Sequence, residues 1–250
     1  MLEYKKVVLK FGGSVIPDTD AIIKVADMVK KISMNYNIVA IVVSAMGKTT
    51  NNLDALAHKM TNKPDLRELD ALLATGEMQS ASLLSIRLNE IGLPARGYNA
   101  WQFGIMTDDK FSDAKIQGVN MRYVNQLYGV PVVAGFQGIT KYNDITTLGR
   151  EGSDISAVAI ATAMGADFCW FFKDGGGIYD KNPIKDKDAR LLREISYTKM
   201  LELLATGRGQ VLHKRSVLAA KKYKMPLFVS GMTNMEMGTL IIPRVHSKVY

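Results

Sequence analysis

The sequence predicts an α/β protein, a three-layer αβα sandwich around a mainly parallel sheet, formed by a single domain over residues 1–250. Short apolar segments rich in β-branched residues alternate with segments of helical periodicity, which is the pattern of βαβ units. Several of the apolar segments end at glycine-bearing turns. The chain has 250 residues, of which 47% are hydrophobic and 22% are charged, and this composition is typical of a globular domain with a sizeable core.

The first predicted elements form one βαβ unit. Residues 7–10 are an apolar strand that stops at a Phe-Gly-Gly-Ser turn. Apolar side chains recur every three or four positions over 19–32, which predicts a helix capped by Thr19 or Asp20. Residues 38–43 are apolar throughout, as expected for a parallel strand that is buried on both faces.

The middle of the chain carries a long helical segment and a further strand. Leucine and alanine are frequent over 66–90, but a Thr-Gly-Glu step at 75–77 interrupts the pattern, so we expect two helices or one kinked helix. Residues 130–134 form another buried strand, which is followed by a glycine turn and a polar loop that reaches Gly152.

The last hundred residues continue the alternation of strands and helices. We predict a helix, a strand, a triple-glycine loop, two helices and two short strands over residues 153–164, 168–172, 175–177, 197–205, 211–223, 227–229 and 240–242. Strands that alternate with helices in this way favour a parallel-centred sheet with helices on both faces.

Composition and charge exclude several classes of protein. The 32 basic and 24 acidic residues give a net charge of +8, but the basic residues are scattered without interleaved aromatics, so nucleic-acid binding is disfavoured. No apolar run approaches the roughly 20 residues that span a bilayer, and the N-terminus lacks a signal-peptide pattern. A single cysteine, Cys169, excludes an intramolecular disulfide and a multi-thiolate metal site. We expect a cytoplasmic protein with no nucleic acid or membrane as partner and no metal held by protein ligands.

The turn after the first strand combines a cation with glycines. Lys10 lies next to Gly12 and Gly13, and a lysine with unhindered backbone N–H groups suits a polyphosphate. A lysine that only covers apolar neighbours with its stem is the alternative. The Gly-Lys-Thr at 47–49 lacks the upstream glycine of a Walker A loop, so a P-loop NTPase is disfavoured.

An ordered series of motifs resembles the aspartokinases of the amino acid kinase superfamily. The motifs are Lys-Phe-Gly-Gly-Ser at 10–14, Val-Ser-Ala-Met-Gly at 43–47 with Thr50 and Asn51, Thr-Gly-Glu-Met-Gln-Ser at 75–80, and the segments 102–108, 135–138 and 146–154. The resemblance runs from about Val7 to Ile242 and implies the amino acid kinase fold. Because residues 238–241 look like the usual end of the catalytic domain, we expect no C-terminal ACT regulatory domain.

The resemblance implies a pocket for L-aspartate. An amino acid with an ammonium and an α-carboxylate needs an anion and a cation, and the family places Glu77 at the first and Arg150 at the second. Ser44, Thr50 and Ser153 are hydroxyl donors in the same region by resemblance. Solvated surface contacts for the charged pair, turn positions for Ser44 and Thr50, and a helix N-cap for Ser153 are the alternatives.

Phosphoryl transfer to such a carboxylate is expected to be electrostatic. An ionised carboxylate is already a nucleophile, so no general base is needed. Lys10, the glycine N–H groups, Mg²⁺ on the ATP phosphates and a helix N-terminus at Ser153 would offset the charge on the transferred group. By resemblance Asp154 organises this set, whereas an acid in the first turn of a helix is its structural alternative.

The nucleotide site departs from the family pattern. By resemblance ATP lies against Lys173, Asp174, Tyr179 and Lys181, yet Lys173 stands where aspartokinases have threonine, and the Asp-Lys-Asn-Pro at 180–183 is closer to uridylate kinases. Gln210 replaces a phosphate-binding lysine of the family. Losing that contact costs about 1.5–3 kcal/mol, so either one of three cations compensates, Arg208, Lys214 or Lys173, or the activity is weak or altered. His213 is predicted to be structural.

The leading hypothesis is therefore an ATP-dependent aspartokinase that acts in the first step toward lysine, threonine and methionine. Its cofactors would be ATP and Mg²⁺, and family analogy favours a homodimer. Two alternatives stay open at this point. One is a uridylate-type or other small-molecule kinase of the superfamily, and the other is an inactive nucleotide-binding regulatory subunit.

Overall fold

An eight-stranded sheet lies at the centre of the computed structural model, which describes residues 5–124, 128–207, 211–235 and 237–244. Its strands are β1 (Lys6–Phe11), β2 (Asn37–Val43), β3 (Ala95–Tyr98), β6 (Val130–Ala134), β9 (Phe168–Phe172), β10 (Glu194–Ser196), β11 (Leu227–Ser230) and β12 (Gly238–Ile242). The order is β10-β12-β11-β9-β1-β2-β6-β3, and every neighbouring pair is parallel except β11 with β12. The predicted mainly parallel sheet is confirmed.

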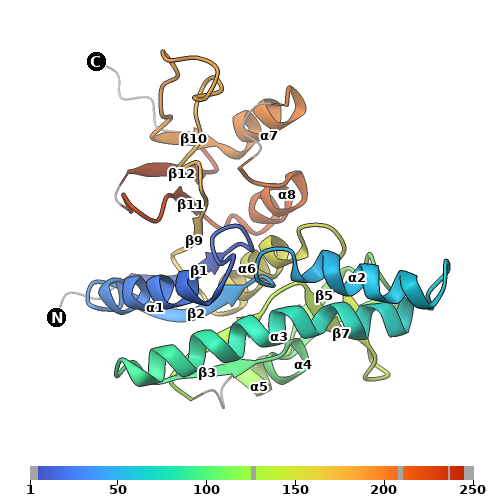
Figure 1. The fold of residues 1–250 in the computed structure, drawn as a ribbon. Helices are drawn as coiled ribbons and strands as arrows, with labels where there is room; N and C mark the ends of the chain where they lie inside the picture. The colour runs from blue at the N-terminus through green and yellow to red at the C-terminus, as the bar shows by residue number, and fades with distance from the viewer. Residues whose placement is uncertain (1–4, 125–127, 208–210, 236, 245–250) are drawn as a thin grey trace.

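Helices cover both faces of this sheet (Figure 1). They are α1 (Thr19–Ser33) and α3 (Leu66–Glu90) on one face, and α6 (Gly152–Ala163), α7 (Tyr197–Ala205) and α8 (Lys214–Tyr223) on the other. Alternation along β1 explains the two cores, since Val7, Leu9 and Phe11 pack with α1 and α3 while Val8 packs with α6. Lys10 falls on the same face of β1 as Val8 and is thereby directed toward α6. The three-layer sandwich is confirmed.

A second, four-stranded sheet was not expected from the sequence. It has the order β5-β4-β7-β8, from strands β4 (Ile105–Thr107), β5 (Ile116–Val119), β7 (Gln137–Ile139) and β8 (Ile145–Thr147). The hairpin β7–β8 lies where we expected a polar loop, so that expectation was wrong. Three-residue strands are too short to show alternation, and β7 is supported by pairing with β4 from a distant part of the chain.

Three further helices connect these parts: α2 (Thr49–Met60), α4 (Ala100–Phe103) and α5 (Met121–Val124). One predicted helix cap and one predicted helix start were wrong. Asp18, not Thr19 or Asp20, caps α1 by accepting a hydrogen bond from the Ala21 N–H at 2.9 Å. Helix α8 begins at Lys214, not at residue 211, because His213 is extended and caps it. The structural role predicted for His213 agrees with this position.

Helix α3 is one continuous helix of 25 residues, not a broken pair. Gly76 lies in its middle, and a Cβ there would be 2.9 Å from the Cβ of Ala45. The glycine therefore lets the helix approach the loop after β2 closely, and it marks a contact rather than a break.

Aromatic side chains form a cluster under the carboxyl end of the central strands. The rings of Phe11 and Phe172 stack at 4.8 Å, and Trp170 stacks on Phe172 at 5.0 Å. The indole Nε1 of Trp170 donates to the Ser230 hydroxyl at 2.7 Å. This cluster fixes β1, β9 and β11 against one another.

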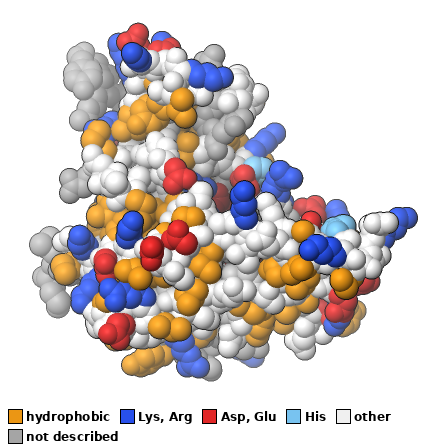
Figure 2. All heavy atoms as spheres, viewed as in Figure 1, with side chains coloured by type: hydrophobic (Ala, Val, Ile, Leu, Met, Phe, Trp, Pro, Cys, Tyr) orange, Lys and Arg blue, Asp and Glu red, His pale blue; other side chains and the backbone are white. Residues whose placement is uncertain are grey.

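Charged side chains of both signs are interspersed over the face of the molecule that Figure 2 shows. Within the described parts of the chain, no helix has both the length and the apolar character that crossing a bilayer requires.

Candidate functional site

Two cavities open where the parallel strands end. The carboxyl ends of parallel strands meet at one edge of a sheet, which is the usual place for ligands in open α/β folds. The first cavity, of about 700 Å³, lies at the ends of β2 and β6 and is bounded by α2, α3 and the start of α6. The second cavity, of about 410 Å³, lies at the ends of β9 and β11. Because β1 lies between β9 and β2, it separates the two cavities.

The first cavity gathers all five residues that the sequence assigned to substrate binding: Ser44, Thr50, Glu77, Arg150 and Ser153. They come from four different places in the chain. Hydrogen bonds between loops hold this wall together, since the Ser44 N–H donates to the Phe11 carbonyl and the Gly47 N–H donates to the Gly13 carbonyl. Ser153 lies in the first turn of α6, but Glu151 is the N-cap, so the alternative of Ser153 as a cap is wrong.

Glu77 brings a buried, half-satisfied carboxylate to the first cavity. Only 3% of the residue is exposed, and its Oε1 accepts from the Ala45 N–H at 3.0 Å. Its Oε2 is buried and has no hydrogen-bond partner among the described residues. Burial raises the pKa of Glu77 to about 8. A buried acceptor without a partner is costly, so this atom favours a cationic or hydrogen-bond-donating ligand.

Arg150 brings a positive charge to the same cavity from the loop between β8 and α6. Its side chain is exposed, and Gly149 before it has a φ of 71°. A Cβ at Gly149 would lie 2.9 Å from the Ser112 carbonyl, so a glycine is needed on both counts. An acid on α3 and a base on this loop thus face one cavity, which can hold a molecule that carries both charges.

Two lysines share one buried carboxylate between the cavities. The Lys10 Nζ lies 2.6 Å from Asp154 Oδ1, and the Lys173 Nζ lies 3.0 Å from Asp154 Oδ2. Lys10 and Asp154 are 3% and 2% exposed. Burial lowers the pKa of Lys10, whereas for Asp154 the raising effect of burial is overcome by the two lysine charges, so that its pKa stays below the ordinary value. One carboxylate against two ammonium groups leaves a net positive site, which suits a phosphate.

The second cavity has a wall of glycines. Gly175, Gly176 and Gly231 line it together with Asp174 and Tyr179, two of the residues that the sequence assigned to the nucleotide. Gly176 has a φ of 69°, a conformation that favours glycine. Such a wall exposes backbone groups to a ligand.

The other residues assigned to the nucleotide lie in three different places. Lys173 directly precedes the second cavity, and Gly12 lies beside Lys10, since a Cβ there would be 3.4 Å from the Lys10 Nζ. Gly13 lines the first cavity instead. Lys181 is half exposed, pairs with Asp186 at 3.0 Å and is not brought to either cavity.

Two of the three cations that could compensate for Gln210, Lys173 and Lys214, are among the described residues. Gln210 and Arg208 lie outside the described residues. Lys214 lines a separate cavity of about 330 Å³ with Glu151 and His213. Of the three compensating cations considered, Lys173 is the one that the structure shows in contact with Asp154.

The sequence did not reveal the polar residues that build the walls of the first cavity. Ser112 and Thr147 line it, and both are bonded to Asp70, which is fully buried on α3. Asp70 lies seven residues before Glu77, a spacing that places both on one face of a helix and could have singled it out. In the described parts of the chain, no three His, Cys, Asp or Glu side chains are grouped so as to hold a metal ion.

The chain is similar to known proteins over most of its length. A model of the amino acid kinase family matches residues 5–231. An aspartokinase from Bacillus sp. (strain MGA3) is 44% identical and one from Thermus thermophilus is 43% identical, each over 238 residues, 94% of this chain and 58% of the relative. The crystal structure of an aspartate kinase from Synechocystis has a TM-score of 0.82 at 39% identity, over 95% of this chain and 40% of that one. The chain thus spans 58% of the length of these curated relatives.

Proposed function

The chain belongs to the amino acid kinase family, and on that premise we propose that it is an aspartokinase, which transfers the γ-phosphoryl group of ATP to the β-carboxylate of L-aspartate. The products are 4-phospho-L-aspartate and ADP. The similarity to curated aspartokinases supports this substrate over a uridylate-type acceptor or an inactive subunit. The organisation of residues 1–250 as a single domain stays a prediction.

The observation that carries the proposal is that an acidic and a basic side chain, Glu77 and Arg150, face the same cavity. The ammonium of aspartate would bind the unpartnered Oε2 of Glu77, and its α-carboxylate would bind the guanidinium of Arg150. Ser44, Thr50 and Ser153 would donate hydrogen bonds around the substrate. With both ends held, the β-carboxylate is directed toward the lysine pair.

In the transfer step, a β-carboxylate oxygen attacks the γ-phosphorus in line, and the bond from that phosphorus to the bridging oxygen of ADP breaks. Lys10 and Lys173 offset the negative charge on the phosphoryl oxygens, and Asp154 holds both ammonium groups in place. No proton has to be removed from the nucleophile. The start of α6 adds backbone N–H groups at the same place.

The nucleotide would occupy the second cavity, with its phosphates over the glycine wall and near Lys10 and Gly12. Tyr179 lines the far part of this cavity, and Asp174 is the acidic residue among its described lining residues. Both oxygens of Asp154 are taken by lysines, so the donor set fits a Mg²⁺ that is bound mainly by the ATP phosphates, with Asp174 beside it. When bound, the ion supplies further charge neutralisation. Lys181 stays a prediction as a nucleotide contact.

Lys173 is proposed as the second cation of the transfer site. It stands where aspartokinases generally have threonine, while Gln210 stands where they have lysine. The contact between Lys173 and Asp154 supports the view that a positive charge has been kept at the site but is supplied from the residue after β9. A location in the cytoplasm, a homodimer, and the absence of nucleic-acid and membrane partners complete the proposal.

An assay of ADP release with purified protein, MgATP and a panel of acceptors tests the function. We expect turnover with L-aspartate and an acyl phosphate that hydroxylamine traps, and little turnover with UMP, glutamate or small phosphates. Turnover with another acceptor but not with aspartate would contradict the substrate. ATP binding without transfer to any acceptor would favour the regulatory subunit.

A further inference from the structure

Asp70 makes four hydrogen bonds across the interior of the protein. It lies on α3 and is fully buried. Its Oδ2 accepts from the backbone N–H groups of Ser112 at 2.8 Å and Thr147 at 2.7 Å. Its Oδ1 accepts from the hydroxyl groups of the same two residues, at 3.1 Å and 2.7 Å. One carboxylate thus ties α3 to the second sheet and to the loop before β5.

The two residues bound by Asp70 belong to the wall that carries Arg150. Ser112 and Thr147 both line the first cavity. Thr147 ends β8, and Gly149 packs against the Ser112 carbonyl. The bonds of Asp70 to Ser112 and to Thr147 therefore both act on the segment that leads into Arg150. The Leu148 N–H donates to the Phe136 carbonyl at 2.9 Å, which fixes the same segment from the other side. The backbone before Arg150 is therefore held in one arrangement.

Asp70 also shares its helix face with the other charged wall. Glu77 lies seven residues, about two helical turns, further along α3. A rigid helix therefore carries Glu77 at one point and the anchor of the Arg150 loop at another. We infer that Asp70 is a positioning residue that fixes the separation between Glu77 and Arg150, and so selects acceptors by the spacing of their ammonium and carboxylate groups. This inference rests on the proposed function.

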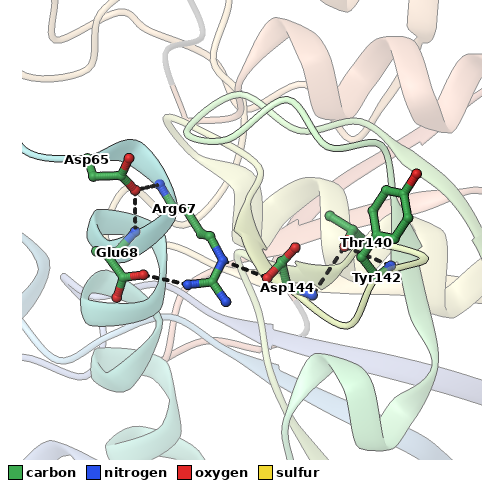
Figure 3. A network of polar contacts seen from close by, with 6 residues as sticks. All are labelled: Asp65, Arg67, Glu68, Thr140, Tyr142 and Asp144. Carbon is green, nitrogen blue, oxygen red and sulfur yellow. Dashed lines mark hydrogen bonds and ion pairs between the residues drawn. The ribbon is translucent and has the colours of Figure 1, made fainter.

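An exposed contact between the same elements provides a matched comparison (Figure 3). Arg67, one turn before Asp70 on α3, pairs with Asp144 between β7 and β8 at 2.6 Å. Its side chain is 54% exposed. Exposed ion pairs contribute little because water screens them, whereas the Asp70 bonds are buried and cannot be replaced by water. If Asp70 served only to join α3 to the hairpin, removal of Asp70 and removal of Arg67 would have similar effects.

Kinetic measurements on three variants test the inference. We expect Asp70→Ala to raise the KM for aspartate by about 10- to 100-fold while the KM for ATP changes by less than about twofold. Asp70→Asn can accept both backbone N–H groups and donate to both hydroxyls, so it should restore the KM for aspartate to within about fivefold of the parent. Arg67→Ala should change neither KM by more than about twofold.

A comparable rise in both KM values, or an unchanged KM for aspartate in a folded Asp70→Ala protein, would overturn the inference. If Asp70→Ala does not fold, Asp70→Ser takes its place, because it keeps a small polar group at the site.

Amide hydrogen exchange gives a readout that does not depend on the acceptor. Exchange over residues 107–115 and 145–151 should accelerate in the variant but not over β1 and β9, and uniform acceleration would contradict a local role. If the parent protein does not phosphorylate aspartate, the proposed function fails, while the exchange result still decides whether Asp70 holds this wall.

Discussion

The two cavities lie on either side of β1 and differ in the residues that line them. The first has buried charged and hydroxyl side chains on its walls, including Glu77 and Ser153, which are 3% and 6% exposed. The second has a run of glycines on one wall and no buried charged side chain among its described lining residues, which also include the exposed Asp174, two methionines, Tyr179, Leu191, Thr233 and Asn234. Side chains can distinguish one small acceptor from another, whereas a glycine wall offers backbone groups that any nucleoside triphosphate can use. On the proposed function, specificity would lie in the first cavity, and phosphate binding would lie in the second cavity and at β1.

Substitution of Lys10, which lies between the cavities, should cause the largest loss of activity, because Lys10 would act on the phosphoryl group as it passes from ATP to aspartate. We expect Lys10→Ala to lower kcat with MgATP and aspartate by about 10³-fold, as the loss of a charged group at the transferred phosphoryl does elsewhere. Circular dichroism and a melting curve serve as the folding control. A loss of less than about tenfold in a folded protein would contradict the role of Lys10.

Glu77 should separate the two cavities kinetically. Glu77→Gln keeps the shape of the side chain but cannot release a proton to become the carboxylate that would pair with the substrate ammonium, so the KM for aspartate should rise by about 10- to 100-fold. The KM for ATP should stay within about twofold, and initial rates at varied aspartate and varied ATP measure both. An equal rise in the two constants would mean that the cavities are not independent.

A substitution of Lys173 tests whether the second lysine bound to Asp154 contributes to phosphoryl transfer. Lys173→Met keeps most of the length of the side chain and removes its charge, so kcat should fall by about 10- to 100-fold, equivalent to about 1.5–3 kcal/mol for one charge-assisted contact. Single-turnover rates at saturating ATP separate this loss from weaker binding. An unchanged kcat would return the compensating role to Arg208 or Lys214.

Glu77 should also make stability depend on pH. The folded protein keeps its proton up to a pKa of about 8, whereas an unfolded glutamate loses it near 4.5. Unfolding therefore releases a proton between these values, and this contribution to stability is complete below pH 4.5 and is lost as the pH rises to 8. Relative to Glu77→Gln, the parent should lose about 3–5 kcal/mol across that window, which is checked by denaturant titrations at several pH values. If the free energy of unfolding depended on pH in the same way in both proteins, the raised pKa of Glu77 would be refuted.

Lys181 should show the smallest effect. It pairs with Asp186 on the exposed loop rather than facing the second cavity. Because an exposed contact with the nucleotide is screened by water and contributes little, Lys181→Ala should change the KM for ATP by less than about twofold, measured beside Lys173→Met in the same assay. A tenfold rise would show that the loop carrying it closes over the nucleotide.

The parts of the structure that follow local patterns could be predicted from the sequence. The strands before Gly12 and Gly135 are apolar and end in turns, so their bounds and the edge that carries the site follow directly. The hairpin β7–β8 could not be found, because its short strands depend on β4 for pairing. Gly76 was misinterpreted as a break because its reason, the contact with Ala45, is tertiary.

The same distinction applies to the site. Lys10 and Glu77 lie within motifs, so resemblance singled them out. Asp70 does not act through its sequence neighbours, since its partners Ser112 and Thr147 are 42 and 77 residues away. Only the folded arrangement shows that these residues meet.

The stacking of Trp170 on Phe172 gives the molecule an intrinsic optical reporter. The indole is bonded to Ser230, and the next residue, Gly231, belongs to the glycine wall of the second cavity. We therefore expect the emission of Trp170 to respond to small shifts at that wall, whereas Trp101 on α4 lies in a separate part of the fold. Ligand binding in the second cavity should then be observable in the unlabelled protein by fluorescence, before any chemistry begins.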